Sequence, residues 1–335
     1  MATTNRTPTE FGTMGFATPG LAAPAAEAAE RDGFDILLLT DSQCLRGDVY
    51  TQLALCGSVT STLKLATGVT NPITRHASVT AASITSIQAE TGGRAILGIG
   101  RGDSSVLHVG RRPATMADYG DYCRQVQAYL RGEEVDQRGF PSRLRWLERV
   151  DVEKVPLDMV GSGPKSLALA AAIGDRVTLA VGAAPDRIEW GMQQVRRGAE
   201  AAFRNPNSIP VGAYINIAIG NDKTKAMESI KGSIATFAHF SASPGADFEN
   251  QPEVMRRVTE RLVTEYDTKH HTEGTAPHTK YLDDSFVDWF GVIGSAEEVV
   301  DRLAPLIRLG LSYIYFVGAG REALTKEVMP ALRAI

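Results

Sequence analysis

The sequence contains few cysteines and no long uncharged apolar run. Its 335 residues include 3 cysteines, at Cys44, Cys56 and Cys123, and none of them belongs to a Cys-x-x-Cys pair. A sparse, odd number of cysteines is not a disulfide framework and is typical of reduced thiols in a cytoplasmic protein. The least charged segment, residues 76–89, is rich in Ser and Thr and is too short for a membrane span. We therefore expect a cytoplasmic protein with no membrane partner.

An excess of positive charge is also missing. The chain has 35 basic and 39 acidic residues, a formal net charge of −4, whereas a nucleic-acid-binding protein carries a basic stripe. The hydrophobic content of 43% excludes disorder as a description of the whole chain. The polar residues 1–9 predict a short disordered lead-in. These observations indicate a soluble, enzyme-sized α/β protein with no nucleic-acid partner.

Several catalytic motifs are absent from the sequence. There is no His-Glu-x-x-His pair, no Walker A loop and no Gly-x-Ser-x-Gly elbow. Metal-dependent hydrolysis, P-loop phosphoryl transfer and acyl transfer by a nucleophile elbow are therefore unsupported, and we expect no metal site.

A repeated unit is present instead, in which a helical pattern ends at a glycine and a short apolar run follows. Gly33, Gly93, Gly174 and Gly310 mark four such junctions, where left-handed backbone geometry ends a helix. Near-continuous apolar runs are typical of strands that are buried on both faces of a parallel sheet. The pattern predicts strands at about residues 10–16, 34–40, 63–69, 94–100, 156–161, 175–181, 210–219 and 311–317. It predicts helices near 19–32, 48–59, 77–91, 114–131, 164–173, 186–203, 223–239, 296–309 and 321–334.

Eight strand–helix units predict an α/β fold, a closed (β/α)₈ TIM barrel, as a single domain over residues 10–335. The second choice is an open doubly wound sheet. It is disfavoured because the run from Gly98 to Asp103 has an aspartate where the dinucleotide-binding fingerprint requires its third glycine. Insertions at about 133–155 and 240–292 interrupt the repeat. We expect them to be either lids or solvated surface elaborations.

The active site of such a barrel lies at the carboxyl ends of its strands. Glycines and small polar residues follow several of the predicted strands, and glycine lets a planar ligand or a phosphate approach the backbone closely. Pro164 opens a helix whose first N–H groups form an anion site, to which Lys165 and Arg101 add positive charge. The candidate residues are Thr40, Asp41, Ser42, Gly68, Val69, Thr70, Gly100, Arg101, Gly102, Asp103, Ser104, Gly161, Ser162, Gly163, Lys165 and Ser166.

Each of these features has a purely structural alternative. Asp41 is also a candidate N-cap of a local turn. Arg101 and Asp103 are also candidates for a surface ion pair of little energetic consequence. The segment 161–166 is compatible with an ordinary helix N-cap as well as with an anion contact.

At these residues the chain resembles the bacterial luciferase-like superfamily of flavin and deazaflavin oxidoreductases, and within it the methylenetetrahydromethanopterin reductase-like branch. The resemblance covers nearly the whole chain and is most specific in the first hundred residues. The matching pieces are Gly33-Phe34, Thr40-Asp41, Val49-Tyr50, Leu53-Ala54-Leu55, Gly68-Val69-Thr70-Asn71-Pro72 with Arg75, Thr80-Ala81, Gly93-Arg94-Ala95, Leu97-Gly98-Ile99-Gly100 and Gly102-Asp103, with weaker matches at Gly161, Gly163-Pro164 and Val292-Ile293-Gly294-Ser295.

The resemblance implies a homodimeric (β/α)₈ barrel that binds coenzyme F420, a deazaflavin, or FMN at the carboxyl ends of the strands. It implies a non-prolyl cis peptide at Gly68–Val69, behind the cofactor ring, with Asp41 near the ring. It also implies that the loops 101–105 and 161–166 lie near the ring edge and the phosphate. Two positions depart from the family pattern, since Ser42 stands where dehydrogenases often carry His and Met14 stands where the reductases carry an acidic residue.

The function that this resemblance implies is an F420-dependent oxidoreductase, which transfers a hydride between the deazaflavin C5 and a small organic substrate. Asp41 and Ser42 are the predicted catalytic residues, and the other candidates bind the cofactor. The arginine-rich segment 138–149 is a candidate contact for the acidic tail of F420. One alternative is an FMNH₂-dependent monooxygenase, which is favoured by Arg101, a residue that resembles the phosphate-binding arginine of FMN-dependent members. A further alternative is a non-catalytic flavin-binding barrel.

Overall fold

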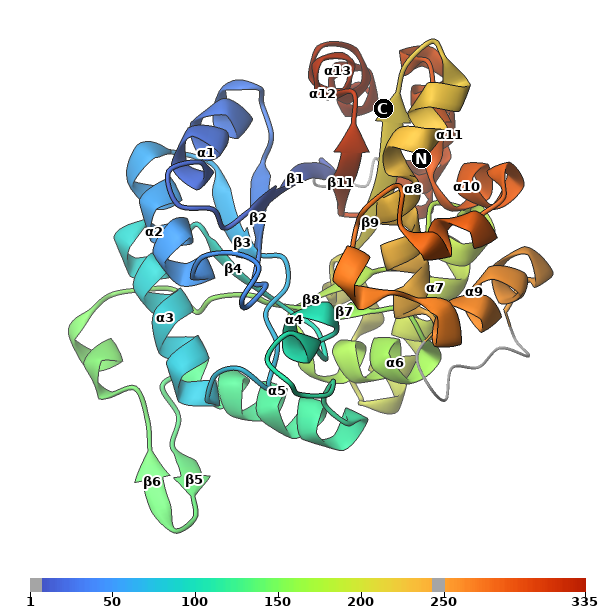
Figure 1. Cartoon of the computed structure of the whole chain (residues 1–335). Helices are drawn as coiled ribbons and strands as arrows, with labels where there is room; N and C mark the ends of the chain where they lie inside the picture. Colours follow the sequence, from blue (N-terminus) through green and yellow to red (C-terminus); the bar gives the residue numbers. More distant parts are fainter. Residues whose placement is uncertain (1–7, 243–250) are drawn as a thin grey trace, which may run out of the picture.

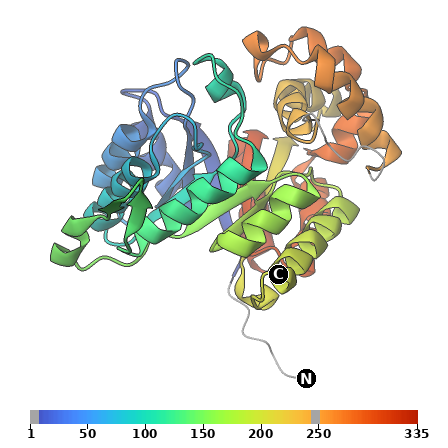
Figure 2. The same cartoon turned by 90° about the horizontal axis from the view of Figure 1, so that it is seen from below.

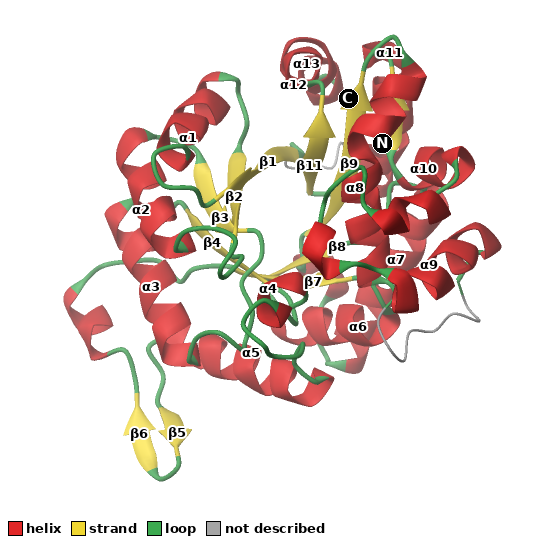
Figure 3. Cartoon of the chain, viewed as in Figure 1, coloured by secondary structure: helices red, strands yellow, loops and turns green. Residues whose placement is uncertain are grey.

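Eight parallel strands form a closed barrel in the computed structural model, which describes residues 8–242 and 251–335 (Figures 1 and 3). Most of the predicted lead-in 1–9 lies outside the described residues. Closure follows from the pairing of β9 with β8 on one side and with β11 on the other, while β11 pairs with β1. The predicted TIM barrel is confirmed. Its strands are β1 (Glu10–Phe16), β2 (Ile36–Thr40), β3 (Lys64–Thr67), β4 (Ala95–Ile99), β7 (Leu157–Gly161), β8 (Arg176–Leu179), β9 (Val211–Ile219) and β11 (Tyr313–Ala319).

Helices surround the barrel close to where the sequence predicts them (Figure 3). The predicted final helix 321–334 consists of α12 (Arg321–Ala323), a π-helical turn (Leu324–Val328) and α13 (Met329–Arg333). No helix of the described residues is long and apolar enough to cross a membrane. The other predicted helices are α1 (Ala22–Arg31), α2 (Val49–Val59), α3 (Ala77–Glu90), α5 (Met116–Leu130), α6 (Pro164–Ile173), α7 (Pro185–Ala201), α8 (Lys223–Phe240) and α11 (Ala296–Leu309).

The glycine junctions are confirmed at three of the four predicted positions. Gly33, Gly93 and Gly310 have φ values of 82°, 97° and 120°, the left-handed region that glycine enters without a steric penalty. Gly174 instead has an extended backbone with φ −69° and ψ 156°, so the left-handed geometry predicted there is wrong. Close packing explains the glycine at this position, because a Cβ would lie 2.8 Å from the Arg176 carbonyl oxygen.

The barrel strands bury both of their faces. In β2, Leu37 and Leu39 belong to the core between the barrel and its helices, whereas Ile36 and Leu38 belong to the core inside the barrel. Side chains alternate across a strand, so a strand that is buried on both sides needs an uninterrupted apolar run. This is why the sequence of β2 is continuous rather than alternating.

A buried carboxylate, Asp158 on β7, organises the interior of the barrel. Its side chain accepts hydrogen bonds from Thr178 Oγ1 at 2.7 Å, Tyr313 OH at 3.1 Å and Tyr315 OH at 2.9 Å. Arg176 lies over the Tyr313 ring at 3.9 Å, with its Nε 4.0 Å from Asp158 Oδ2. Burial, and next the charge of Asp158, raise the pKa of both tyrosines well above its usual range, so both hydroxyls stay protonated and donate.

The segment 133–155 lies at the amino ends of the strands. It contains the hairpin β5 (Val135–Gln137) and β6 (Phe140–Ser142), which projects away from the barrel (Figure 1). Gln88 at the end of α3 donates to the Glu153 carbonyl at 3.2 Å, and Lys154 pairs with Asp175, just before β8, at 2.5 Å. The interpretation of this segment as a lid is therefore wrong, because the connection from a helix to the next strand runs at the end of the barrel opposite the predicted site.

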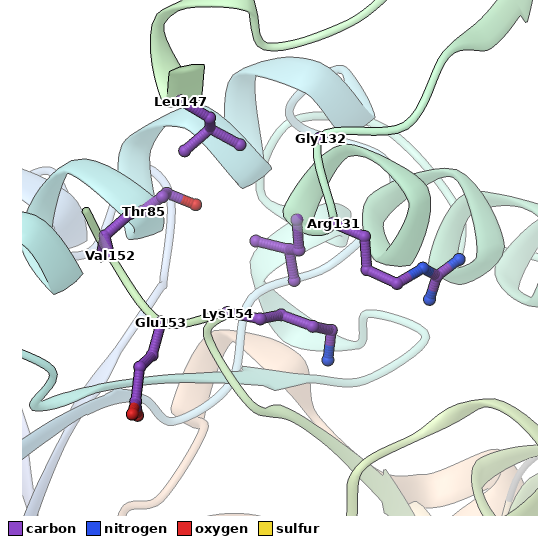
Figure 4. A pocket seen from close by; sticks show the side chains of 8 residues that line it. Thr85, Arg131, Gly132, Leu147, Val152, Glu153 and Lys154 are labelled. Atoms are coloured by element: carbon purple, nitrogen blue, oxygen red, sulfur yellow. The ribbon is translucent and has the colours of Figure 1, made fainter. Parts of the chain in front are cut away.

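Two surface hollows also lie at the amino ends. One has a volume of about 400 Å³ and includes residues of the segment 133–155, with Arg131 and Lys154 on the same side of it (Figure 4). The other, of about 430 Å³, lies between α7 and the start of β9. Neither is lined by a predicted site residue.

The second insertion lies at the carboxyl ends and begins earlier than predicted. It contains α8, α9 (Glu253–Glu265) and α10 (Asp284–Phe290), and it ends at β10 (Val292–Gly294), a strand the sequence did not predict. β10 pairs with the last residues of β9, and α11 follows it. The ring of Phe237 on α8 packs 5.3 Å from that of Tyr214 inside the barrel. The helix at 223–239 is therefore the first element of the insertion, which begins near residue 220 rather than 240.

We predict that Asp158→Ala lowers the free energy of unfolding by about 3–5 kcal/mol, because it removes the buried acceptor of the Thr178, Tyr313 and Tyr315 hydroxyls and one of the two carboxylates near Arg176, the other being Glu10. Urea unfolding followed by circular dichroism measures this loss. Asp121→Ala is the control, since Asp121 is exposed on α5 and its removal changes stability by less than about 0.5 kcal/mol. Equal stability of the two variants would contradict the role given to Asp158.

Candidate active site

Asp41, the residue after β2, joins the loops of two neighbouring strands. Its side chain is buried, with 3% of the residue exposed. One oxygen, Oδ2, accepts from Thr70 Oγ1 at 2.7 Å and from Arg75 Nη1 at 2.6 Å, and the other accepts from Gln43 Nε2 at 2.6 Å. Because Thr70 and Arg75 follow β3, the carboxylate holds the ends of β2 and β3 together.

Arg75 is fixed between two carboxylates. Its second nitrogen, Nη2, donates to Asp48 Oδ2 at 2.9 Å, and its guanidinium lies 4.9 Å from the centre of the Tyr50 ring. Burial alone lowers the pKa of Arg75, but the charge of Asp41 and the hydrogen bond to it outweigh burial and raise that pKa above its usual value. Asp48 is the N-cap of α2, so helix capping does not explain Asp41.

The loop after β3 lies against the ends of both neighbouring strands. The peptide bond Gly68–Val69 is cis, as the resemblance implies. The Gly68 N–H donates to the Leu39 carbonyl of β2 at 2.8 Å, and the Thr70 N–H donates to the Gly98 carbonyl of β4 at 2.9 Å. A Cβ at Gly68 would lie 2.7 Å from the Cβ of Leu38. The site therefore requires glycine at position 68 for close approach of the backbone.

The loop after β4 contains Gly100–Ser104 and leads into α4 (Ser104–Leu107). The Gly100 N–H donates to the Thr70 carbonyl at 3.0 Å, which continues the chain of contacts from Asp41. Arg101 Nε donates to the Ala114 carbonyl at 2.8 Å, so this side chain supports its own loop. Asp103 pairs not with Arg101 but with His239 of α8, whose Nε2 lies 3.6 Å from Asp103 Oδ1. The Arg101–Asp103 ion pair is therefore absent among the described residues.

The loop after β7 opens α6 at the same end of the barrel. Ser166 Oγ accepts from the Gly163 N–H at 3.2 Å and donates to the Gly163 carbonyl at 3.0 Å, so Ser166 caps the helix. Nothing lies within 4 Å of a Cβ built at Gly163, and Lys165 is exposed. Ser162 Oγ donates to the Phe240 carbonyl of α8 at 2.9 Å. The helix start is capped and faces open space, which is compatible with an anion contact.

Buried polar atoms along this rim test whether a polar cofactor fits. Thr40 Oγ1, Asn71 Nδ2 and Asp103 Oδ2 are buried and have no hydrogen-bond partner among the described residues. Buried polar atoms are nearly always paired. Unpartnered buried atoms also occur away from the rim, at Thr85 and Gln127 for example, but these three lie at the ends of β2, β3 and β4, where a polar ligand could pair with them. Together with the cations Arg101 and Lys165, these residues fit a planar, anionic cofactor.

The structure brings most of the predicted site residues to one rim. Asp41, the run 68–70 and Gly100 are linked by the contacts above, and Thr40 and the half-buried Ser42 flank Asp41 in the chain. The loops 101–104 and 161–166 are both held by α8, through His239 and Phe240. Figure 2 shows α4 and the segment 251–290 on the same side of the barrel, opposite the C-terminus.

Four residues at the rim are absent from the predicted set. Arg75 and Gln43 bond directly to Asp41, and Arg75 was detectable as a cation in the loop next to a strand-end carboxylate. His239 and His271 contact Asp103 and Ser104. No sequence signal identifies these histidines, because the placement of the second insertion across the rim depends on packing that the sequence pattern does not encode.

The chain belongs to the family described as luciferase-like monooxygenase, whose model matches residues 2–313. A curated relative, 5,10-methylenetetrahydromethanopterin reductase of Methanolobus tindarius, is 30% identical over 90% of this chain and 92% of its own length. The resemblance to the luciferase-like superfamily and its methylenetetrahydromethanopterin reductase-like branch, and the prediction of an oxidoreductase enzyme, are confirmed.

Two solved structures share the fold. The coenzyme F420-dependent tetrahydromethanopterin reductase from Methanopyrus kandleri has a TM-score of 0.74 and 23% identity, covering 97% of this chain and 100% of that one. An F420-dependent secondary alcohol dehydrogenase in complex with an F420-acetone adduct has a TM-score of 0.76 and 18% identity, covering 97% of this chain and 99% of that one.

We predict that Asp41→Asn lowers the free energy of unfolding by about 1.5–3 kcal/mol, because the amide keeps the shape but removes the buried charge that faces the half-buried Arg75 guanidinium. Asp48→Asn is the matched control, since it alters the other carboxylate on Arg75 at an exposed position and costs less than about 1 kcal/mol. Urea unfolding of both variants measures the difference. A larger loss for Asp48→Asn would show that Asp41 is not the main partner of Arg75.

Proposed function

We propose that the protein is an F420-dependent oxidoreductase that transfers a hydride between the deazaflavin C5 and a small organic substrate. The observation that carries the proposal is the continuous rim from Thr40 to Gly100, lined by small residues and by unpartnered buried polar atoms. The F420-dependent relatives support the choice of cofactor, since two proteins of this fold are named for F420. Homodimer formation and the substrate both remain predictions.

Thr40, Gly68, Val69 and Thr70 would hold the ring of the cofactor. Gly68 lacks a side chain and is packed on Leu38 of β2, so the backbone at 68–69 is suited to lie against the face of the ring. The Thr70 hydroxyl is already committed to Asp41, which fixes its orientation. Thr40 Oγ1 is buried without a partner and is suited to hydrogen-bond with a polar edge of the ring.

The remaining candidates would hold the anionic part of the cofactor. Lys165 is exposed at the start of α6, where the first N–H groups and the helix dipole favour negative charge. Gly161, Ser162, Gly163 and Ser166 shape this helix start. Across the rim, Gly100, Gly102, Asp103 and Ser104 surround Arg101, whose Nε is bonded to Ala114. The arginine-rich segment 138–149 is not part of this proposal, because 133–155 lies at the other end of the barrel.

When bound, F420 supplies a two-electron carrier whose C5 gives or accepts a hydride. Asp41 is held at both oxygens and cannot reorient, so it contributes a fixed negative charge beside the ring. The Asp41 charge is shared with the Arg75 guanidinium, and the adjacent Ser42 carries a half-buried hydroxyl that would exchange a proton with the substrate. The insertion over the rim excludes water from one side of the site.

An FMNH₂-dependent monooxygenase is the second candidate. It is favoured by membership of a family described by monooxygenase activity and by Arg101, a cation placed beside the predicted phosphate contacts. The cofactor separates the two functions, because deazaflavin lacks the N5 on which flavin oxygen chemistry depends. A protein that binds cofactor but oxidises no reduced cofactor with any substrate would support the third candidate, a non-catalytic flavin-binding barrel.

Titration of the purified protein with F420 and, separately, with FMN tests the proposal through the change in cofactor absorbance. We expect saturable binding of F420 and much weaker binding of FMN. Clear binding of FMN without binding of F420 would contradict the proposed function and favour the monooxygenase.

We predict that Lys165→Ala weakens F420 binding by about three- to tenfold at low ionic strength, an effect that salt reduces because the cation is exposed. Lys326→Ala is the control, since Lys326 is exposed in the π-helical turn before α13. Fluorescence titration of F420 at two salt concentrations measures the affinity of both variants. Unchanged affinity in Lys165→Ala would remove the start of α6 from the cofactor site.

A further inference from the structure

A cluster of aromatic and imidazole rings lies where the second insertion meets the rim. It consists of His239 on α8 and of Tyr266, His271 and His278 farther along the insertion, and we call it the histidine cluster. Tyr266 is at its centre. Its ring stacks on His239 with centroids 4.0 Å apart and an interplanar angle of 7°, and it lies 4.3 Å from His278. Its hydroxyl bonds to His271 Nδ1 at 2.7 Å and to Thr236 Oγ1 at 3.0 Å.

The histidine cluster holds the loop after β4 at two adjacent residues. His271 Nε2 lies 3.2 Å from Ser104 Oγ, and His239 Nε2 lies 3.6 Å from Asp103 Oδ1. Ser104 is buried, with 8% of the residue exposed. His271 is therefore bonded on both ring nitrogens, to a residue of the insertion on one side and to a residue of the rim on the other.

The loop after β4 depends on contacts with other segments because it contains little secondary structure of its own. The helix α4 has four residues, fewer than a helix needs to be stable alone, and Gly102 has a φ of 90°. On one side the loop is held by the reciprocal contacts between Arg101 and Ala114. On the other side the contacts to His271 and His239 are what fix Asp103 and Ser104.

We propose that His271 is a positioning residue that holds the loop 100–104 in the conformation that binds the anionic part of F420. The proposal rests on the proposed function, since it assigns a second role to the same site. His271 acts through Ser104 and does not itself contact the cofactor. The adjacent His270 points elsewhere, because its Nδ1 pairs with Asp267 at 2.7 Å.

The contact depends on pH in a definite direction. Burial lowers the pKa of His271, the neighbouring His239, His108 and His278 lower it further, and Asp103 opposes them. The imidazole is therefore neutral at pH 7, and its protonation in acid places a cation among other imidazoles. Since the folded-state pKa lies below the unfolded value, the stabilisation given by the neutral imidazole is complete above the unfolded value and is lost as the pH falls through the folded-state pKa. The groups facing His271 are Asp103, Ser104 and His108 from the segment after β4, His239 from α8, and Tyr266 and His278 from the insertion.

The test is the dissociation constant of F420 between pH 5.5 and 8 for the wild type, His271→Phe, His271→Gln and the control His270→Gln. At pH 8 we expect about tenfold weaker binding by His271→Phe, the loss of one hydrogen bond to the loop, with partial recovery in His271→Gln. The wild type and His270→Gln should lose affinity together as the pH falls. Any protonation of F420 itself affects all four proteins equally. The two His271 variants should therefore lose less F420 affinity than the wild type as the pH falls.

The outcomes distinguish failure of the proposed function from failure of the positioning role alone. Failure of the wild type to bind F420 would refute the proposed function. Binding by the wild type with equal affinity in both His271 variants, or with the same pH dependence in all four proteins, would refute the positioning role alone. Melting temperatures identify any variant that has lost its fold, and His271→Gln then provides the comparison, since its amide can still bond to Ser104.

Discussion

Closure of the parallel sheet at β9 is the constraint on which the rest of the molecule depends. β9 pairs with β8 along its first residues, with β11 along most of its length and with β10 at its end. Because all these strands are parallel, closure brings every strand-end loop to one rim. It also places the second insertion, which leaves from the end of β9, across that rim and in contact with the loops after β4 and β7.

The two ends of the barrel interior are completed by different buried carboxylates. Asp158 accepts hydrogen bonds from three hydroxyls and lies beside Arg176 inside the barrel. Asp41 is also satisfied, by Thr70, Arg75 and Gln43, but its neighbours Thr40 and Asn71 carry unpartnered atoms. The Asp158 cluster therefore fills the barrel interior with polar contacts between its own residues, whereas the polar groups beside Asp41 lie at the ends of the strands, where the site is predicted.

The fold was predictable because its signals are local. Continuous apolar runs after glycines identified four of the eight strands, the remaining apolar runs supplied the other four, and the alternation of strands with helices identified the barrel. The motif at 67–72 also located the loop with the cis peptide. Contacts between segments that are far apart in the sequence could not be predicted in the same way. Gly174 lies at a helix end for a packing reason, the 133–155 segment lies at the amino ends because of chain direction, and the contact of His271 with Ser104 joins residues 167 positions apart, which no local pattern encodes.

A crystal structure of the protein with F420 bound tests the central claim most directly. The account predicts the deazaflavin ring against the backbone at Gly68–Val69, with Asp41 beside it and the phosphate between the start of α6 and the loop 100–104. A cofactor bound in a hollow at the amino ends of the strands, or bound at the rim with no contact to Gly68, Val69 or the start of α6, would contradict it.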